Sequence, residues 1–256
     1  MADLAANRRM RILELLEERQ SVSTAELSQD LGVSEMTIRR DLADLEKSLA
    51  LKRTYGGATL KYDLGQTSLF ALRSRLHVAE KKAIAKKAIG LVKEGETIFL
   101  DASSTCYYFA QEIKQCKGLT IVTNSPLLTW ELMTFPAIKV ICLGGTLRHQ
   151  TGSLVGPETE ELLLKLHADK LFIAVKGISL EAGLTEDDTA EAQVKRNKIK
   201  ASTEVILLSD HSKFGGISLI QVAPLESVSC AVVDTGVGNE YLEPLRARGI
   251  KVIIAD

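Results

Sequence analysis

Three small hydroxyl residues stand together in this 256-residue sequence: Ser103, Ser104 and Thr105 follow Asp101 and the apolar run Thr97–Leu100. At a turn from a strand into a helix, such hydroxyls and the adjacent backbone N–H groups can surround an anion, which the helix dipole also favours. A phosphate group therefore fits this turn. The simpler alternative is that Ser103 or Ser104 only caps the helix that follows, and on this stretch alone capping is slightly favoured.

A second group of chemistry-bearing residues lies in the first 60 positions, where Arg39 and Arg40 stand near the start of a predicted helix. A recognition helix presents its N-terminal residues to the major groove, and arginines there contact guanine edges or phosphates. Lys52 and Arg53 lie on a predicted hairpin, whose cations would meet the phosphate backbone. The residues predicted to bind double-stranded operator DNA are Ser34, Glu35, Met36, Thr37, Arg39, Arg40, Lys52 and Arg53.

The elements that would position this second group form a winged helix-turn-helix. Asn7–Arg19 shows helical spacing of apolar residues, and Ser23 with Glu26 makes a capping-box pattern for a second helix ending near Leu31. Gly32 suits the left-handed turn after that helix. Residues 51–59 would form the wing. The third helix is expected to bury Ile38, Leu42, Leu45 and Leu49.

Bulk charge does not favour nucleic acid as a partner. The formal net charge is −1, and residues 1–60 contain nine Lys and Arg against ten Asp and Glu. A protein-interaction module with a solvated arginine face is therefore the alternative interpretation. DNA binding is favoured because the cations cluster where a winged domain touches DNA, in the two pairs named above and in the group Arg8, Arg9 and Arg11.

After Gly95 the sequence alternates short apolar runs with helical patterns, which is typical of a largely parallel sheet covered on both faces. The predicted strands are Thr97–Leu100, Leu119–Thr123, Ile138–Leu143, Leu171–Val175, Val205–Ser209, Ala231–Val233 and Lys251–Ala255. Ligands of such sheets bind beyond the carboxyl ends of the strands. Those ends carry the polar or glycine residues Asp101–Thr105, Asn124, Ser125, Gly144, Gly145, Lys176, Gly177 and Asp210.

Length and composition predict a globular cytoplasmic protein of two domains. With 45% hydrophobic residues, the chain can build one large core and one small one. We expect a DNA-binding domain at 1–60, a connector with a helix over Glu80–Lys93 at 61–93, and an α/β domain at 94–256. No apolar leader or run of eighteen apolar residues indicates export or a membrane. The four widely spaced cysteines indicate reduced thiols.

Val33–Glu46, followed by Arg53–Ala58, closely resembles the signature of the DeoR family of transcription regulators. The resemblance implies a repressor of a carbohydrate operon that a phosphorylated sugar modulates, and it favours phosphate binding at the hydroxyl turn over capping alone. Winged domains usually read paired half-sites, so we expect a homodimer or homotetramer. The resemblance covers nearly the whole sequence, because it continues through Leu100–Thr105, Val122–Ser125, Gly144–Gly145, Leu154–Gly156 and Asp210–Phe214.

The second domain also resembles the Rossmann-like fold of ribose-5-phosphate isomerases and CoA transferases. This likeness places Lys176, Glu191 and Lys195 near the sugar end of the effector and Lys213 at its edge. Some family members have Asp where this chain has Lys176, and a cation there would favour a more anionic effector. Glu191 and Lys195 could instead only pair with each other at i, i+4. The predicted effector-binding residues are Asp101, Ser103, Ser104, Thr105, Thr123, Asn124, Ser125, Gly144, Gly145, Lys176, Gly177, Glu191, Lys195 and Lys213.

Two enzyme classes compete with a regulator that has no cofactor and no catalytic residue. A sugar-phosphate isomerase or transferase could use Lys176 or Glu191 as acid or base, but an isomerase would want two carboxylates near the fourth strand end, where residues 174–177 supply none. A dinucleotide-dependent oxidoreductase is suggested by Gly236–Gly238, but Tyr241 replaces the third glycine. No metal site is expected, because the histidines are scattered at His77, His149, His167 and His211.

Overall fold

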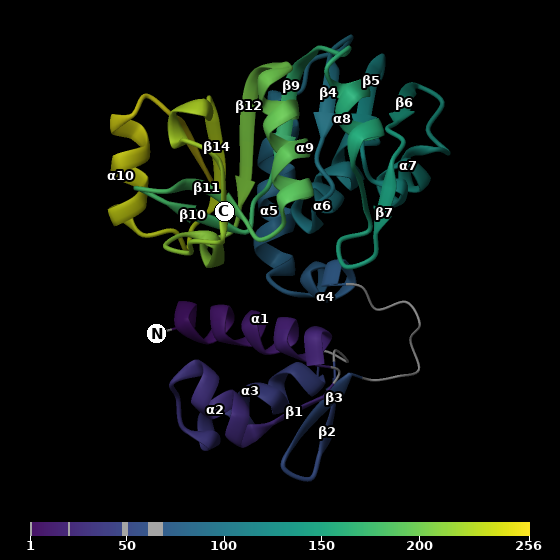
Figure 1. Cartoon of the computed structure of the whole chain (residues 1–256). Helices are drawn as coiled ribbons and strands as arrows, with labels where there is room; N and C mark the ends of the chain where they lie inside the picture. The colour runs from purple at the N-terminus through teal and green to yellow at the C-terminus, as the bar shows by residue number, and fades with distance from the viewer. Residues whose placement is uncertain (1, 20, 48–50, 61–68) are drawn as a thin grey trace. The chain divides into compact units, whose positions relative to one another are not determined.

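The computed structural model describes residues 2–19, 21–47, 51–60 and 69–256. The chain divides into two compact units, Met1–Arg75 and Leu76–Asp256 (Figure 1). The first unit contains α1 (Ala2–Arg19), β1 (Ser21–Ser23), α2 (Thr24–Leu31), α3 (Glu35–Lys47), β2 (Leu51–Thr54), β3 (Gly57–Leu60) and α4 (Leu69–Arg75).

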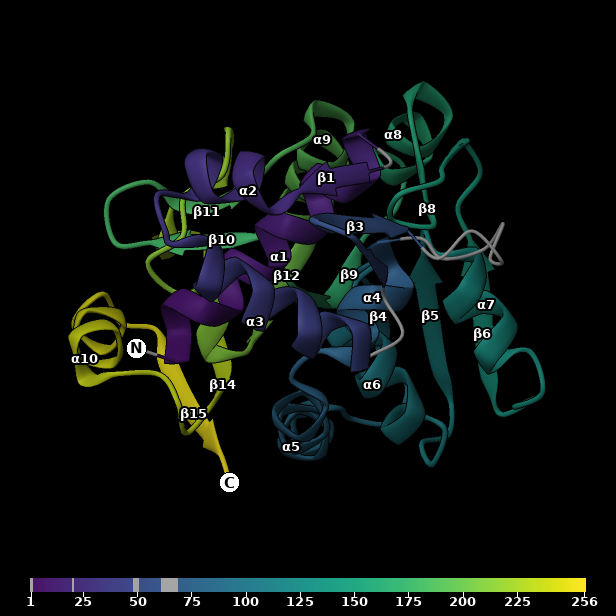
Figure 2. The same cartoon turned by 90° about the horizontal axis from the view of Figure 1, so that it is seen from below.

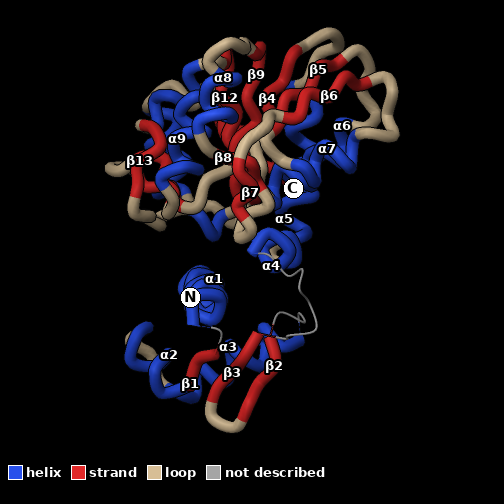
Figure 3. Tube along the Cα trace, turned by 45° about the vertical axis from the view of Figure 1, so that its right-hand side comes forward, coloured by secondary structure: helices blue, strands red, loops and turns tan. Residues whose placement is uncertain are grey.

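Local sequence signals explain the helix-turn-helix of the first unit. Ser23 caps α2 through a complete capping box with Glu26, and Gly32 ends the helix in the left-handed conformation at φ 63°. Both features agree with the sequence prediction. The strands form an antiparallel sheet in the order β1-β3-β2 beside the helices (Figure 3). Gly57 begins β3 where a Cβ would stand 2.1 Å from the Val22 carbonyl oxygen, so only glycine fits there.

The core of the first unit lies between α1, α2 and α3. Ile38, Leu42 and Leu45 of α3 are buried, as the helical spacing predicted, while Leu49 lies outside the described residues. They share this core with Leu27 of α2. The buried residues of α1 are Ile12, Leu13, Leu15 and Leu16.

The second unit is built on a seven-stranded sheet in the order β15-β14-β12-β9-β4-β5-β6, with every neighbouring pair parallel. Its strands are β4 (Thr97–Leu100), β5 (Leu119–Thr123), β6 (Ile138–Cys142), β9 (Ala168–Ile173), β12 (Ser202–Ser209), β14 (Cys230–Asp234) and β15 (Lys251–Ala255). The helices and 3-10 turns are α5 (Val78–Ala88), η1 (Ile89–Leu91), α6 (Ser104–Ile113), α7 (Pro126–Leu132), α8 (Pro157–Leu163), α9 (Thr189–Lys200), η2 (His211–Lys213), η3 (Leu225–Ser227) and α10 (Asn239–Ala247).

Helices cover both faces of this sheet because its strands are apolar on both sides. On β9, Phe172 packs into the core with α5, α6 and α7, while Leu171 and Ile173 pack into the core with α8, α9 and α10. Figure 2 shows α5 and α6 on one side of β4 and β9, and α8 and α9 on the other. The sequence prediction of an α/β domain, with a largely parallel sheet covered on both faces, is confirmed.

Some boundaries differ from the prediction. The third strand ends at Cys142, one residue before Leu143, and the fourth spans Ala168–Ile173 instead of Leu171–Val175. Charged residues hid its start: Lys170 is buried and pairs with Glu96. The helix predicted over Glu80–Lys93 begins at Val78 and passes into η1 after Ala88. None of the described helices is both long enough and apolar enough to cross a membrane.

Short strands beside the main sheet were not predicted. They are β7 (Thr146–Arg148), β8 (Ser153–Val155), β10 (Gly177–Ser179), β11 (Gly183–Glu186) and β13 (Ile220–Ala223). The pair β7-β8 forms a hairpin, and β10, β11 and β13 form a small antiparallel sheet. Runs of three or four residues show too little alternation for a periodicity argument to detect.

Candidate functional sites

The exposed side of α3 carries the residues predicted to read DNA. Ser34 caps the helix, because its hydroxyl accepts a hydrogen bond from the Thr37 N–H at 3.3 Å. Met36, Arg39 and Arg40 in the first turns are exposed, while the opposite side is buried. The unit therefore presents basic side chains from the N-terminal half of the second helix of a helix-turn-helix, the part that enters a major groove.

Two of these cations make only exposed ion pairs. Arg39 meets Glu35 at 3.3 Å, and Arg53 on β2 meets Glu46 at 2.8 Å. Exposed pairs of this kind contribute about 0–1 kcal/mol, so phosphate oxygens can displace them at little cost. Tyr55 is fully exposed at the tip of the wing between β2 and β3, and the sequence argument did not single it out.

Arg8 and Arg9 do not join this basic surface as the sequence argument expected. Arg8 Nε and Arg9 Nε lie 2.5 and 2.9 Å from the two carboxylate oxygens of Asp41, which is buried, and Arg9 also bonds Asp44 at 2.6 Å. These pairs tie α1 to α3 inside the unit. Only Arg11 of the three is exposed.

In the second unit, five buried polar residues meet at the carboxyl ends of β4 and β5, and we call them the lysine–aspartate cluster. Asp101 and Asn124 follow β4 and β5, Glu186 ends β11, and Lys195 and Lys198 come from α9. Lys195 Nζ lies 2.5 Å from one Asp101 oxygen and Lys198 Nζ lies 2.9 Å from the other. Lys198 also donates to Asn124 Oδ1 at 2.6 Å, and Lys195 lies 3.4 Å from Glu186. The two cations balance the two carboxylates, so the cluster is neutral.

The cluster fixes the ionisation of its members. Burial alone would raise the pKa of Asp101, but Lys195 and Lys198 outweigh it and hold the pKa at about 2. Burial would likewise lower the pKa of Lys195, yet Asp101, Glu186 and Glu191 raise it above its usual value. Both groups therefore remain charged across the physiological pH range.

The hydroxyl turn follows Asp101 directly and starts α6. Ser103 is the helix cap, accepting a hydrogen bond from the Cys106 N–H at 3.1 Å, so the capping interpretation holds for this residue. Ser104 and Thr105 are buried, and neither their hydroxyls nor their backbone N–H groups hydrogen-bond to any described residue. The turn thus combines a capped helix start with donors that bond to none of the described residues.

The remaining predicted effector residues divide into neighbours of the cluster and structural residues. Thr123 Oγ1 accepts from the Ser125 N–H, and Ser125 caps α7. A Cβ on Gly145 would stand 2.2 Å from Thr159 Oγ1, and one on Gly177 would stand 2.5 Å from the Gly216 carbonyl oxygen. These glycines allow close packing of the loops. The Gly144 carbonyl oxygen accepts a hydrogen bond from the Thr159 hydroxyl.

The three other charged residues of the prediction are Glu191, Lys176 and Lys213. Glu191 is buried at the start of α9 and accepts hydrogen bonds from the hydroxyls of Thr151 and Ser153. Lys195 forms its ion pairs with Asp101 and Glu186 and not with Glu191. Lys176 pairs with Asp187, and Lys213 lies on η2 after β12.

Sequence reasoning missed Lys198, a fully buried lysine that bonds both Asp101 and Asn124. The signal was present, because Lys198 stands three residues after Lys195 and so shares its face of the helix. The histidine argument also missed a contact. The fold brings His77 and His211 together with Glu80, with one ligand atom of each within 4.8 Å of the others.

A winged helix-turn-helix with an exposed basic helix, joined to a doubly wound α/β unit, defines the class of DNA-binding transcription regulators with a separate sensor domain. Residues 8–62 match the family model of the DeoR-like helix-turn-helix domain, and residues 76–235 match that of the DeoR C terminal sensor domain. The chain belongs to the DeoR family of transcription regulators.

Curated relatives agree over nearly the full length. Among them are the uncharacterized HTH-type transcriptional regulator YulB of Bacillus subtilis (36% identity, 97% of this chain and 96% of the relative) and the HTH-type transcriptional regulator GolR of Listeria innocua (34%, 97% and 98%). A putative aga operon transcriptional repressor of Escherichia coli O157:H7 is 32% identical over 97% of this chain and 93% of its own. The chain is therefore a regulator, and the isomerase, transferase and oxidoreductase alternatives are set aside.

A solved structure of ribose 5-phosphate isomerase A from Methanocaldococcus jannaschii is also similar. The similarity covers 52% of this chain and 53% of the isomerase, with 19% identity and a TM-score of 0.39. This likeness is too distant to support any statement on function.

Proposed function

We propose that this regulator represses a carbohydrate operon and that a phosphorylated sugar bound at the hydroxyl turn lowers its affinity for operator DNA. The observation that carries the proposal is the pair of buried residues Ser104 and Thr105, whose N–H groups and hydroxyls have no acceptor or donor among the described residues. A phosphate at the start of α6 would supply the acceptors and meet the positive end of the helix dipole. A relative named as a putative aga operon transcriptional repressor supports the role as an operon repressor.

The lysine–aspartate cluster supports this role by holding the turn in place. Asp101 precedes the turn and is tied to α9 through two lysines, so the backbone beside the phosphate position is anchored to a second helix. Because the cluster is neutral, the added phosphate charge is not repelled by a net negative site. Effector binding that changes operator affinity 5- to 150-fold corresponds to a coupling of about 1–3 kcal/mol.

Thermal shift against a panel of sugar phosphates and their unphosphorylated parents tests the effector. A ligand that binds the folded chain raises its stability by RT ln(1 + [L]/Kd), so one phosphate is expected to raise Tm while its parent sugar does not. Ser104→Asp places a negative charge in the turn and is expected to abolish the shift while operator binding is retained. No shift with any phosphate would contradict the effector proposal and leave the regulator class unaffected.

Arg40→Ala tests the DNA-reading role of α3. Arg40 is exposed and forms no ion pair with a described residue, so the change should lower operator affinity without loss of fold or effector binding. If Arg40 contacts a phosphate, the salt dependence of binding should fall by about one ion. The matched control is Arg19→Ala, which removes an exposed arginine paired with Asp30 at the end of α1. Equal loss of affinity in both variants would contradict the assignment.

We also propose a cytoplasmic homodimer or homotetramer that binds paired half-sites. Two small winged domains on one assembly can contact two turns of DNA at once. Sedimentation equilibrium of the full chain, with and without a two-site operator fragment, tests the assembly, and a monomer bound to a single half-site would contradict it.

A further inference from the structure

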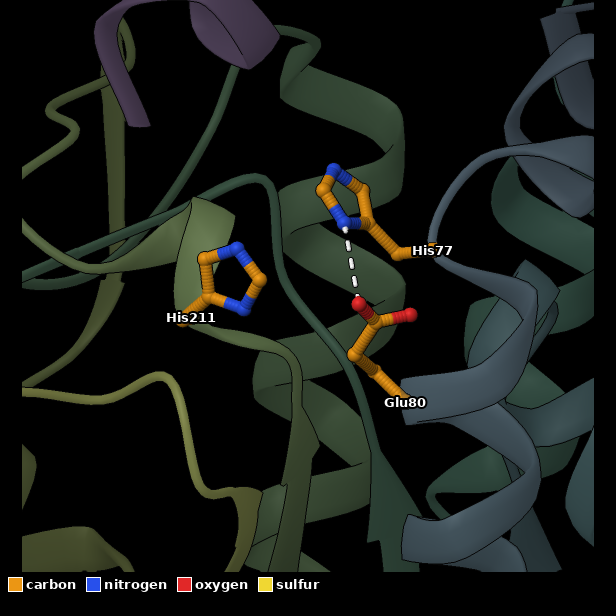
Figure 4. Close-up of side chains that lie close together, drawn as sticks. All are labelled: His77, Glu80 and His211. Carbon is orange, nitrogen blue, oxygen red and sulfur yellow. Dashed lines mark ion pairs between the residues drawn. The ribbon is translucent and has the colours of Figure 1, made fainter. Parts of the chain in front are cut away.

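We propose that the second unit contains a binding site for one divalent transition metal ion, formed by His77, Glu80 and His211. One potential ligand atom from each residue lies within 4.8 Å of the other two. Figure 4 shows His77 and Glu80 at the start of α5, with the Glu80 carboxylate facing the His77 ring, and His211 of η2 beside them. His77 Nδ1 and Glu80 Oε1 are 3.9 Å apart.

The distance between His77 Nδ1 and Glu80 Oε1 suits two ligands of one metal ion better than a direct hydrogen-bonded pair. Two ligands bound at 2.0–2.1 Å to a tetrahedral ion stand about 3.4 Å from each other. The His77–Glu80 separation exceeds this by about half an ångström, which a small side-chain rotation removes. All three side chains are partly exposed, so an ion can enter from solvent without unfolding the unit.

A carboxylate behind one of the histidines is an independent sign of a metal ligand. Asp234 Oδ2 lies 2.7 Å from His211 Nδ1, and the other Asp234 oxygen accepts the His211 backbone N–H at 2.6 Å. An imidazole that donates its Nδ1–H to a carboxylate carries its lone pair on Nε2 and ligates with that atom. Carboxylate–histidine pairs of this type orient metal ligands and raise their basicity.

The backbone at His77 also indicates a ligand position. With φ 51° and ψ 44°, His77 is left-handed, and no other non-glycine residue that the structure describes has a positive φ. Such conformations are costly and gather at ligand sites. This one turns the His77 side chain toward Glu80 on the first turn of its own helix.

The nearby carboxylates outnumber the nearby lysines by one. Glu80, Asp234 and Asp210 contribute three negative charges, and Lys81 and Lys213 contribute two positive ones. Asp210 is fully buried, and its Oδ2 receives no hydrogen bond from any described residue. A bound cation would stabilise that oxygen. Two imidazoles and a carboxylate are ligands for zinc and its neighbours, whereas Mg²⁺ and Ca²⁺ prefer oxygen ligands.

The test uses the untagged full chain after treatment with a chelator. Equilibrium dialysis with elemental analysis should find one Zn²⁺ per chain, Co²⁺ should give the visible spectrum of a low-coordinate site, and Zn²⁺ but not Mg²⁺ should raise Tm. His77→Asn removes the imidazole but keeps a residue that tolerates the left-handed backbone. It and His211→Gln should weaken Zn²⁺ binding at least tenfold.

Histidine variants outside the site are the controls. His149→Gln and His167→Gln should bind Zn²⁺ like the original chain, and metal-free circular dichroism should show that every variant is folded. Absence of stoichiometric Zn²⁺ binding by the original chain would overturn the proposal. Equal affinity in His77→Asn and in the two control variants would also overturn it. Neither result bears on operator or sugar-phosphate binding, so the proposed function is tested separately.

Discussion

Replacing Asp101 by asparagine removes the central charge of the lysine–aspartate cluster while keeping the shape of the side chain. In the original chain the two carboxylate oxygens each receive one lysine ammonium group, and both lysines are buried. Asp101→Asn leaves two buried cations with fewer partners. Lys195 keeps Glu186 and the Ala174 carbonyl oxygen, and Lys198 keeps Asn124.

Breaking a buried ion pair by removing one partner costs about 3–5 kcal/mol. Because both lysines retain other acceptors, we expect the lower end, about 3 kcal/mol. For a unit of this size that loss lowers Tm by about 6–12 °C. Glu161→Gln is the control, since it removes an exposed pair with Lys165 and should change Tm little.

The pH dependence of this loss distinguishes a charge effect from a packing effect. The pKa of Asp101 is lowered to about 2 in the fold from 3.8. A lowered carboxyl pKa stabilises the fold above the unfolded value, and this stabilisation is lost as pH falls toward the folded value. Between pH 7 and pH 3 the original chain should therefore lose about 1 kcal/mol that Asp101→Asn cannot lose.

Urea unfolding followed by circular dichroism at several pH values measures both quantities. The difference in unfolding free energy between the two chains should be about 3 kcal/mol at pH 7 and about 1 kcal/mol smaller at pH 3. A difference below 1 kcal/mol at pH 7 would refute the role of the cluster in stability. A large difference that does not change with pH would show that shape, and not charge, is responsible.

Two further substitutions test the DNA-binding unit. Asp41→Ala removes the buried acceptor of two arginines, so it should lower the free energy of unfolding by about 1–3 kcal/mol and weaken operator binding through loss of fold. The control Asp30→Ala, which removes an exposed ion pair, should change the unfolding temperature little. Gly57→Ala places a Cβ against the Val22 backbone and should lower Tm and distort the wing. The control Gly90→Ala has open space around the new Cβ and should leave Tm unchanged. Equal Tm values for the two variants would contradict the close approach of β3 to Val22.

Features that depend on neighbours in the sequence were predictable. The capping box at Ser23 and Glu26, the left-handed Gly32 and the buried face of α3 all follow from spacing within one or two turns. The parallel sheet was predictable for the same reason, because each of its strands contains a short apolar run. The start of β9 was missed because it includes the charged residues Asp169 and Lys170.

Contacts between distant residues were not predictable from spacing. Asp41 bonds Arg8 and Arg9, which stand more than thirty positions earlier in the sequence. The two arginines that were expected to contact DNA therefore form ion pairs inside the unit. His77 and His211 meet because α5 begins where β12 ends, which depends on strand order. Periodicity identifies the strands but does not encode the order in which they pair.

The state of the carboxylates supports the proposed effector-binding role of this site over an enzymatic one. An acid–base catalyst of isomerisation needs a carboxyl group whose pKa lies near the working pH. Here the pKa of Asp101 is held at about 2 by two lysines, and Glu191 is occupied by the hydroxyls of Thr151 and Ser153. Asp101 and Glu191 are each bound to other protein groups, while the hydroxyls and N–H groups of Ser104 and Thr105 have no hydrogen-bond partner among the described residues. This arrangement supports the proposal that the turn binds an anion without transforming it.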